Sequence, residues 1–353
     1  MTRDHQTPDT ATTAVAPAHR FDEQRLYAYL KGRIAGLGSA LEVRQFQGGT
    51  SNPTFLLTTD GAAGERRYVL RKKPPGALLS SAHQVDREHR VMKALEGKVP
   101  VPHMQLLCED PEVIGAAFYV MDYLDGRIFR DARLPGLARA EQAEIYDQLN
   151  LTLAKLHQVD FNAVGLSDYG RPGNYFERQI KRWIKQYRDG ETEVIPEMEE
   201  LIATLPNLIP DEASVSIAHG DYRLENTMFA RDEPRLIAVL DWELSTIGHP
   251  LADIAYNCFL WHSTRSSWGT LTGVDFATSG IPTEEKYLEA YCRRTGRSGV
   301  AHWNFYLAFS IFRLAAISQG VYRRILADIA ASNRRAENNA PELSRQALAI
   351  LRR

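Results

Sequence analysis

Cysteine and long apolar runs are both scarce in this chain of 353 residues. The three cysteines, Cys108, Cys258 and Cys292, are spaced neither as paired metal ligands nor as a disulfide framework, so we expect a reducing, cytoplasmic environment. No apolar run approaches the ~18 residues that a membrane span requires, and the N-terminus lacks the apolar core of a signal peptide. These absences predict a protein that does not associate with membranes.

Excess charge of either sign is also absent. Lys and Arg number 42 against 44 Asp and Glu, which gives a formal net charge of −2. A chain without a basic field has no long-range attraction for nucleic acid, so we expect no nucleic-acid partner. Any anion must therefore be recognised locally. The hydrophobic content of 44% suffices for two cores, and no pattern points to a particular oligomeric state.

The most informative part of the sequence is a polar segment at residues 216–230. Asp221 precedes Asn226 by five residues, a spacing that lets one tight loop present a carboxylate to a hydroxyl and an amide oxygen to a metal. Asp241 follows an apolar run at residues 236–240, which is typical of a buried strand. Phosphoryl transfer depends mainly on positioning and on neutralisation of charge by Mg²⁺. We therefore predict Asp221 as the catalytic residue and Asn226 and Asp241 as the Mg²⁺ ligands.

Each of these residues has an ordinary structural explanation when it stands alone. An aspartate before a turn often caps a helix, and Asn226 is a residue type that suits a left-handed turn. The joint spacing of the three, with one of them ending a buried strand, favours the functional interpretation. His219 is different, because we expect it to anchor the loop by packing and hydrogen bonding and to have no chemical role.

This pattern resembles the catalytic and metal-binding loops of the aminoglycoside and choline kinase superfamily. The sequence His219-Gly-Asp-x4-Asn226 stands where protein kinases carry His-Arg-Asp, and Asp241-Trp-Glu243 replaces their Asp-Phe-Gly. The segment Gly248-His-Pro-Leu-Ala-Asp253 is also typical of the superfamily. The resemblance extends from about residue 25 to about residue 330, and its closest form is the phosphotransferase domain found beside some acyl-CoA dehydrogenases.

The resemblance implies an α+β, bilobal, protein-kinase-like fold with a small β-rich N-lobe, a larger and mostly helical C-lobe, and ATP as the phosphoryl donor. Residues 1–20 are rich in Thr, Ala, Asp and Pro without periodicity, which predicts a disordered tail. We place the nucleotide-binding N-lobe at residues 21–121, the hinge at 122–126, and the catalytic, acceptor-binding C-lobe at 127–353.

A glycine-rich hairpin upstream of the catalytic segment is the expected phosphate cradle. Residues 41–47 and 54–59 alternate apolar and polar side chains as strands do, with a turn between them. Glycines let backbone N–H groups approach phosphate oxygens, and hydroxyls can donate as well. The Gly-x-Gly-x-x-Gly pattern of protein kinases is absent, and an ordinary hairpin turn is the alternative. The predicted cradle residues are Gly48, Gly49, Thr50, Ser51 and Asn52.

The strand at residues 67–71 should supply the cation that holds the phosphates. Where most kinases carry lysine, alignment with the kinase strand motif places Arg71, while Lys72 points to the opposite face if the strand continues. Arginine keeps its charge and binds phosphate through two donors, so the function survives the replacement. We expect its partner on the helix at residues 81–95, at Glu88, with Asp86 as the alternative.

A buried strand at residues 117–121 is expected to end at the hinge. In the related kinases, main-chain groups of this segment hold adenine, and the register here places them at the Asp122 carbonyl and the Leu124 N–H. Met121 would then back the adenine pocket. A plain transition from strand to loop is the competing explanation.

Apolar stripes predict C-terminal helices at residues 138–159, 175–188, about 283–295, 302–331 and 341–352. In this superfamily, the second of these and the C-terminal helices wall the acceptor site, which aminoglycoside enzymes usually line with carboxylates. A basic wall instead favours an acceptor with phosphates or a carboxylate, such as a hydroxyacyl-CoA, and a solvated basic surface is the alternative. The basic residues on the helix at 175–188 are Arg178, Lys181, Arg182, Lys185 and Arg188.

The sequence therefore predicts an ATP- and Mg²⁺-dependent phosphotransferase that acts on a hydroxyl of a small molecule. A hydroxyacyl-CoA is the favoured acceptor, and an aminoglycoside or other antibiotic is the alternative. A nucleotide-binding pseudokinase that serves as a scaffold is the alternative from another class. The arginine at position 71 is its only support, and the intact Asp221, Asn226 and Asp241 argue against it.

Overall fold

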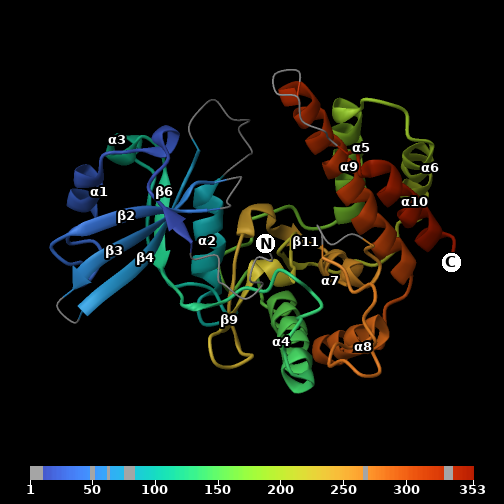
Figure 1. Cartoon of the computed structure of the whole chain (residues 1–353). Helices are drawn as coiled ribbons and strands as arrows, with labels where there is room; N and C mark the ends of the chain where they lie inside the picture. The colour runs from blue at the N-terminus through green and yellow to red at the C-terminus, as the bar shows by residue number, and fades with distance from the viewer. Residues whose placement is uncertain (1–10, 48–51, 62–63, 75–83, 265–268, 330–336) are drawn as a thin grey trace. The chain divides into compact units, whose positions relative to one another are not determined.

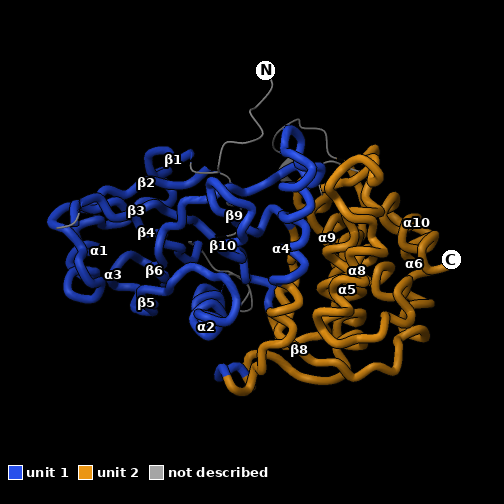
Figure 2. The backbone as a smooth tube through the Cα atoms, turned by 90° about the horizontal axis from the view of Figure 1, so that it is seen from below, with its two compact units in different colours: residues 1–152, 164–166, 224–245 blue, residues 153–163, 167–223, 246–353 orange. Residues whose placement is uncertain are grey.

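The computed structural model describes residues 11–47, 52–61, 64–74, 84–264, 269–329 and 337–353. The chain folds into two compact units (Figure 2). Unit 1 comprises residues 1–152, 164–166 and 224–245, and unit 2 comprises residues 153–163, 167–223 and 246–353. Because the chain passes between the units several times, neither unit is one continuous segment of sequence.

An antiparallel sheet forms much of unit 1 (Figure 1). Among the described residues its strand order is β1-β2-β3-β4-β6-β5. Alternating side chains set its faces, since Phe55, Leu57 and Thr59 on β3 are buried and the residues between them are less so. The strands are β1 (Thr12–Thr13), β2 (Leu41–Phe46), β3 (Thr54–Gly61), β4 (Gly64–Lys72), β5 (Met104–Cys108) and β6 (Phe118–Asp122).

Helices pack against this sheet. α1 (Glu23–Leu30) buries Leu26 and Leu30 in one cluster with Phe55, Leu57 and Phe118. α2 (Val85–Leu95) contacts β5 and β6 and buries its predicted apolar stripe. The short α3 (Pro111–Ile114) follows β5, and α4 (Arg139–His157) is the long helix expected at residues 138–159.

Part of the expected N-terminal tail is ordered. Thr12 and Thr13 form β1, which pairs antiparallel with β2, and Ala16 N donates to Gln45 Oε1 at 3.0 Å. The prediction of a disordered tail over residues 1–20 is therefore wrong for residues 11–20, because pairing to a sheet edge requires no hydrophobic periodicity. Residues 1–10 lie outside the described part of the chain.

A smaller sheet joins distant parts of the sequence within unit 1. β7 (Gly126–Arg127) pairs with β9 (Thr227–Ala230), and β9 pairs with β10 (Leu236–Val239). Gly126 permits this approach, since a Cβ atom there would lie 2.5 Å from Phe229 O. The pairing draws residues 224–245 into unit 1, so the units do not divide at the predicted hinge, residues 122–126.

Helices make up most of the described part of unit 2. α9 (Trp303–Ile329) is central, because it contacts α5, α7 and α10 (Figure 1). The helices predicted at 175–188, 283–295, 302–331 and 341–352 are all present with ends shifted by at most a few residues. The other elements are α5 (Tyr175–Gly190), α6 (Pro196–Thr204), β8 (Ser216–Ala218), β11 (Thr246–Gly248), α7 (Pro250–Cys258), α8 (Glu284–Thr295) and α10 (Ala340–Leu351).

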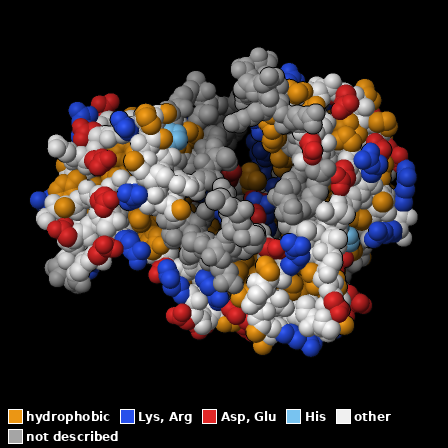
Figure 3. Space-filling model, in the orientation of Figure 1, with side chains coloured by type: hydrophobic (Ala, Val, Ile, Leu, Met, Phe, Trp, Pro, Cys, Tyr) orange, Lys and Arg blue, Asp and Glu red, His pale blue; other side chains and the backbone are white. Residues whose placement is uncertain are grey.

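By length and composition, α9 resembles a membrane-spanning helix, contrary to the expectation from apolar runs. An 18-residue window within Trp303–Leu326 has a mean hydropathy of 1.2, and 72% of that window is buried inside the protein. Such burial is typical of the central helix of a large core. On the face drawn in Figure 3, acidic and basic side chains are interspersed rather than gathered by sign, as the small net charge suggests.

Candidate active site

Arg71 joins three elements of unit 1. It lies on β4, and its Nε is 3.2 Å from Oε2 of Glu88 on α2. Its Nη2 donates to Oδ1 of Asp241, which follows β10, at 2.8 Å, and lies 3.8 Å from Oε2 of Glu243. The ion pair expected between Arg71 and Glu88 is therefore present, and the guanidinium also reaches the carboxylate predicted to bind metal.

Lys72 points to the opposite face of β4, as the alternation of a strand requires. Its Nζ donates to Ile114 O at 3.4 Å and lies 5.1 Å from the ring centroid of Phe21. Burial lowers the pKa of Lys72. On α2, Asp86 is exposed whereas Glu88 is buried. The registers of β4 and α2 thus place Arg71 and Glu88 in this ion pair, rather than Lys72 and Asp86.

Two polar side chains from distant segments hold Glu88. Asn52 Nδ2 donates to Glu88 Oε1 at 2.8 Å, and the Tyr119 hydroxyl donates to Oε2 at 3.0 Å. Glu88 is only 1% exposed. Burial raises its pKa to about 7 despite the neighbouring guanidinium of Arg71, and the negative charge of Asp241 adds to the effect.

The expected phosphate cradle is described only at its last residue. Asn52 is buried, with 1% of its surface exposed, and its side chain supports Glu88. The side-chain amide is thus directed at a buried carboxylate, and a contact of the Asn52 backbone with phosphates stays a prediction. The rest of the cradle lies outside the described residues, at Gly48, Gly49, Thr50 and Ser51.

A cavity of about 180 Å³ in unit 1 adjoins Arg71 and Asp241. Met121, Asp122 and Leu124, the residues expected around adenine, all line it. The main-chain contacts predicted at the Asp122 carbonyl and the Leu124 N–H stay predictions. A flat aromatic base suits a wall with few polar side chains, and the other apolar residues of this wall include Val69, Met92, Pro102, Tyr119, Ile128, Met228 and Leu240.

The two predicted metal ligands belong to one hairpin of unit 1. In the β9–β10 pair, Thr227 is opposite Val239, and Leu240 N donates to Asn226 O at 2.8 Å. Asn226 and Asp241 therefore stand at the same end of the hairpin. Asp241 has φ 62° and ψ 61°, a left-handed conformation that aspartate adopts more readily than most residues.

This donor set fits a metal that keeps most of its other ligands. Among the residues that the structure describes, no group of three or more His, Cys, Asp and Glu side chains could hold a metal ion. One carboxylate and one amide oxygen are too few for a closed structural site. They suit Mg²⁺, which is commonly held by one or two carboxylates together with phosphate oxygens and water.

Asp221 belongs to unit 2, in the segment after β8. Its Oδ1 accepts a hydrogen bond from the Tyr256 hydroxyl and lies 3.7 Å from Arg223 Nε. Its backbone N donates to Nδ1 of His219 at 3.2 Å, and His219 is fully buried. His219 therefore anchors the loop, as the sequence suggested. The chain passes from unit 2 to unit 1 between Arg223 and Leu224, so Asp221 and Asn226 fall in different units.

Asp253 lies on α7 and contacts this segment, although the sequence gave it no predicted role. Its carboxylate accepts from the backbone N of His219 at 2.5 Å and of Gly220 at 2.8 Å. Although burial opposes it, the hydrogen bond from His157 helps to keep the pKa of Asp253 below its usual value. The sequence did carry a signal for Asp253, which is the single carboxylate among the apolar residues 251–255. A charge that is buried in such a run requires partners.

The basic residues of α5 are largely engaged by neighbours within unit 2. Lys181 pairs with Glu177 at 2.7 Å and Lys185 with Asp189 at 2.6 Å. Arg188 pairs with Glu199 on α6, Arg178 donates to Gly173 O, and Arg182 lies over the ring of Trp183. Acids one helical turn away or on α6 thus neutralise part of the charge of this basic surface, and its binding of substrate stays a prediction.

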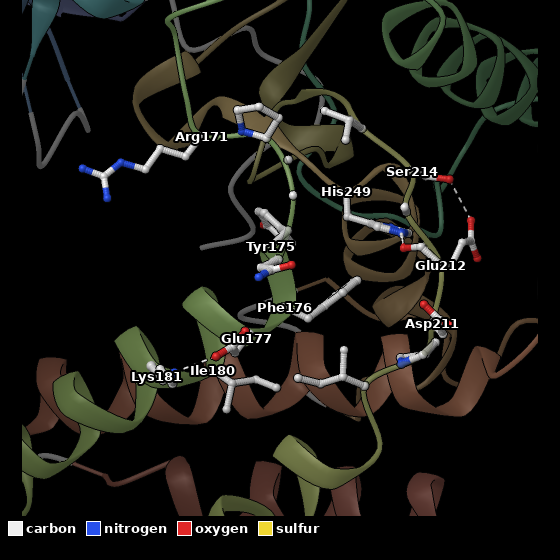
Figure 4. A pocket seen from close by; sticks show the side chains of 18 of the residues that line it. Arg171, Tyr175, Phe176, Glu177, Ile180, Lys181, Asp211, Glu212, Ser214 and His249 are labelled. Carbon is white, nitrogen blue, oxygen red and sulfur yellow. Dashed lines mark hydrogen bonds and ion pairs between the residues drawn. The ribbon is translucent and has the colours of Figure 1, made fainter.

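A larger cavity, of about 630 Å³, lies in unit 2 (Figure 4). Several of its polar groups are bonded to one another, with Lys181 donating to Glu177 and His249 Nε2 lying 3.2 Å from Glu212 O. Burial lowers the pKa of His249 to about 4, so its ring is neutral near pH 7.

The β8–β11 ladder shows where this cavity lies relative to the catalytic segment. Gly248, which lines the cavity, pairs with Ser216, and Thr246 pairs with Ala218. Asp221 follows Ala218. The cavity is therefore at the opposite end of this ladder from Asp221.

Comparison with known proteins places these residues in a family. The model of the Phosphotransferase enzyme family matches residues 42–306, which include Arg71, Glu88, Asp221, Asn226 and Asp241. The chain belongs to this family. By this family membership the chain is a phosphotransferase.

One curated relative of the phosphotransferase is acyl-CoA dehydrogenase family member 10 of Mus musculus. The two are 44% identical over 326 residues, which cover 91% of this chain and 30% of that protein. The phosphotransferase thus spans less than half the length of this relative.

Solved structures agree with the assignment. A structure from Ralstonia eutropha JMP134, named provisionally as an aminoglycoside phosphotransferase, has a TM-score of 0.84 and 44% identity, with 94% of this chain and 99% of that one covered. Choline kinase from Cryptosporidium parvum Iowa II has a TM-score of 0.63 at 15% identity, with 94% and 95% covered. The predicted α+β, protein-kinase-like fold class is confirmed.

Proposed function

We propose that the protein transfers the γ-phosphoryl group of ATP to a hydroxyl group of a small molecule, with Mg²⁺ as its second cofactor. The observation that carries this proposal is the ion-pair network of Arg71 beside the cavity of unit 1. It supports a site in which a cation for phosphates, a carboxylate for a metal and an apolar pocket belong to the same unit.

Unit 1 would hold the nucleotide. Its adenine would occupy the cavity bordered by Met121, Asp122 and Leu124. Arg71, fixed by Glu88, would bind the phosphates through its guanidinium. Solved aminoglycoside phosphotransferases with this fold contain ADP or ATP, which supports the choice of donor.

Asn226 and Asp241 would hold Mg²⁺ together with phosphate oxygens and water. Bound there, the ion neutralises charge on the phosphates during transfer. The hydrogen bond from Arg71 to Asp241 keeps this carboxylate next to the cation that the phosphates would also meet. Metal and phosphate sites would thus form around one carboxylate.

Asp221 would act on the acceptor. Its carboxylate orients the hydroxyl and takes up its proton, while the hydroxyl oxygen bonds to the γ-phosphorus and the bond to the departing ADP oxygen breaks. His219 and Asp253 hold the backbone of the segment through buried hydrogen bonds. They position the carboxylate and take no part in proton transfer.

A hydroxyacyl-CoA remains the acceptor that we propose. The similarity to proteins named as acyl-CoA dehydrogenase family members supports it. A phosphotransferase part and a dehydrogenase part of one polypeptide would be expected to act on related thioesters. On α5, Lys181 and Lys185 are 73% and 75% exposed at their side chains, so both can still meet phosphates of CoA. The names of several structural neighbours favour an aminoglycoside as the second candidate.

A pseudokinase scaffold has less support than catalysis. It rested on the arginine at position 71, yet this arginine contacts both Glu88 and Asp241. Planar guanidinium donors can serve two carboxylates and still bind phosphate bidentately. The replacement is therefore compatible with an active site.

The deciding experiment measures release of ADP from Mg·ATP across a panel of hydroxylated metabolites, including hydroxyacyl-CoA thioesters and aminoglycosides. We expect turnover with one class only. The control is Asp221→Asn, which preserves shape and should lower kcat by at least ~10²-fold while nucleotide affinity changes only a few fold. Turnover near the wild-type rate in this variant would contradict the assignment of Asp221, and no turnover with any acceptor would favour the scaffold.

A further inference from the structure

A tyrosine that the proposed function leaves unused contacts the side chain of Asp221. Tyr256 lies on α7 and donates its hydroxyl hydrogen bond to Asp221 Oδ1. Burial raises the pKa of Tyr256, so its hydroxyl keeps its proton and remains a donor at neutral pH. The same carboxylate oxygen has Arg223 Nε at 3.7 Å. Two elements of unit 2 therefore meet at Oδ1.

A buried arginine fixes this tyrosine and the loop together. Arg313 lies on α9 and is 7% exposed. Its guanidinium carbon is 5.2 Å from the ring centroid of Tyr256 and 5.4 Å from that of Trp183 on α5, distances typical of cation–π contacts. Its Nη2 donates to Gly220 O, directly before Asp221. One side chain thus contacts both the tyrosine ring and the backbone of the catalytic segment.

Packing alone does not explain a charged group at this place. A buried guanidinium is costly unless charges and hydrogen bonds compensate it, and a neutral side chain would fill the space between two aromatic rings more cheaply. Arg313 contacts the ring of Tyr256, and the hydroxyl of this tyrosine donates to the carboxylate of Asp221. A series of side-chain contacts thus links α5, α9 and α7 to the catalytic segment, through Trp183, Arg313, Tyr256 and Asp221.

We propose that Tyr256 and Arg313 are positioning residues, which hold the Asp221 carboxylate and its backbone in the orientation that receives the acceptor hydroxyl. This inference rests on the proposed function, because it takes Asp221 as the catalytic residue. Both residues act through Asp221 rather than on the substrate. The charged and titratable groups near Asp221 in the described part of unit 2 include Tyr256 and Asp253 on α7, Arg313 on α9, and His219 and Arg223 on the segment itself.

The first test separates positioning from binding in the whole protein, with Mg·ATP as probe and water as acceptor. Tyr256→Phe removes the hydroxyl and keeps the ring under Arg313. We expect kcat to fall about 10-fold while KM for ATP stays within about twofold.

Matched variants decide whether these effects are specific. Arg313→Met should lower kcat in the same way, and Arg313→Lys should recover part of it, because lysine keeps the charge but not the planar donors. The control is Tyr306→Phe, which removes a hydroxyl directed at Glu212, 3.3 Å away, elsewhere in unit 2. Its kcat should match that of the wild type. An unchanged kcat in Tyr256→Phe, or a KM for ATP that changes as much as kcat, would overturn the proposal.

A second measurement needs no catalysis. Hydrogen–deuterium exchange of backbone amides at residues 219–223 should be faster in Tyr256→Phe and Arg313→Met than in the wild type, and unchanged in Tyr306→Phe. Equal exchange in all proteins would refute the positioning role. If exchange changes as expected but the wild type turns over Mg·ATP with no acceptor of the panel, the proposed function fails while the structural link to Asp221 stands.

Discussion

At the scale of single residues, Arg71 explains how an active site tolerates the loss of the usual lysine. An ammonium is a point charge, whereas a guanidinium presents several donors in one plane. Arg71 uses this geometry to contact Glu88 through Nε and Asp241 through Nη2. Asn52 and Tyr119 then hold Glu88 from the other side. The cation is therefore fixed by a network and not by one ion pair.

Replacement of Asp241 tests the metal site. Asp241→Ala removes the carboxylate predicted to bind Mg²⁺, so the affinity for ATP should fall when Mg²⁺ is present and change little when it is absent. Isothermal titration calorimetry with and without Mg²⁺ measures this difference. Asp232→Ala, in the exposed turn of the same hairpin, is the control. Unchanged affinity for Mg·ATP in Asp241→Ala would count against the metal role.

The pKa of Glu88 makes stability depend on pH. Burial raises this pKa from 4.5 to about 7, so the folded protein binds the proton more tightly than the unfolded chain. The stability that results is fully present below pH 4.5 and is lost as the pH rises through about 7. We expect the free energy of unfolding of the wild type, relative to Glu88→Gln, to fall over this range in denaturant titrations.

Glu96, at the end of the same helix, provides a control of opposite sign. Although burial opposes it, the hydrogen bond from Met104 N lowers the pKa of Glu96. The stability that this group contributes is therefore lost as the pH falls through its folded pKa. In the same titrations, the free energy of unfolding of the wild type, relative to Glu96→Gln, should rise with pH in the acidic range. A wild-type curve parallel to that of Glu88→Gln would mean that Glu88 is ionised throughout.

At the scale of elements, α5 combines an apolar face with a locally neutralised basic face. Phe176, Ile180, Trp183 and Tyr187 are buried, and the exposed lysines pair with acids one turn away. Such exposed pairs contribute only a few tenths of a kcal/mol each. The lysines can therefore exchange these partners for a ligand at little cost.

Charge reversal on α5 distinguishes the two acceptor classes. Replacement of Lys181 and Lys185 by Glu should raise KM for a hydroxyacyl-CoA, and the effect should shrink with salt because exposed charges are screened beyond ~8–10 Å. KM for ATP should hardly change, and a cationic aminoglycoside should bind better. Steady-state kinetics at two ionic strengths measure these effects. If neither acceptor responds, α5 is an ordinary solvated surface.

At the scale of the whole molecule, unit 1 depends on residues far apart in the sequence. β7 pairs with β9, and Val239 N donates to Pro100 O at 2.8 Å. Residues 224–245 thus complete a unit whose main part ends at residue 152. The site residues of the β9–β10 hairpin reach unit 1 only because the chain returns to it.

This topology predicts that unit 1 cannot be isolated by a single cut. A fragment of residues 1–152 lacks β9, the partner of β7, and the strand whose Val239 N donates to Pro100 O. We expect it to show no cooperative thermal transition by circular dichroism, in contrast to the full chain. A fragment that adds residues 224–245 through a short linker is the control and should regain a transition. Cooperative unfolding of the 1–152 fragment alone would show that the hairpin is dispensable.

The sequence alone determined the features that depend on local patterns. Alternation on β3 gave the faces of the sheet, alignment with the kinase strand motif placed Arg71, and apolar stripes gave the long helices nearly to their ends. The spacing of Asp221, Asn226 and Asp241 identified the candidate site. These features could be predicted because neighbouring residues and a fixed period set them.

Only the tertiary structure decided which distant side chains support the site. Tyr119 meets Glu88 across 31 positions of sequence, and Arg313 meets Gly220 across 93. The side chain of Asn52 donates to Glu88 across 36 positions, a contact that appears only once the fold has placed this turn residue. No periodicity links such pairs, since each contact depends on how separate elements pack and on the need of a buried polar group for a partner.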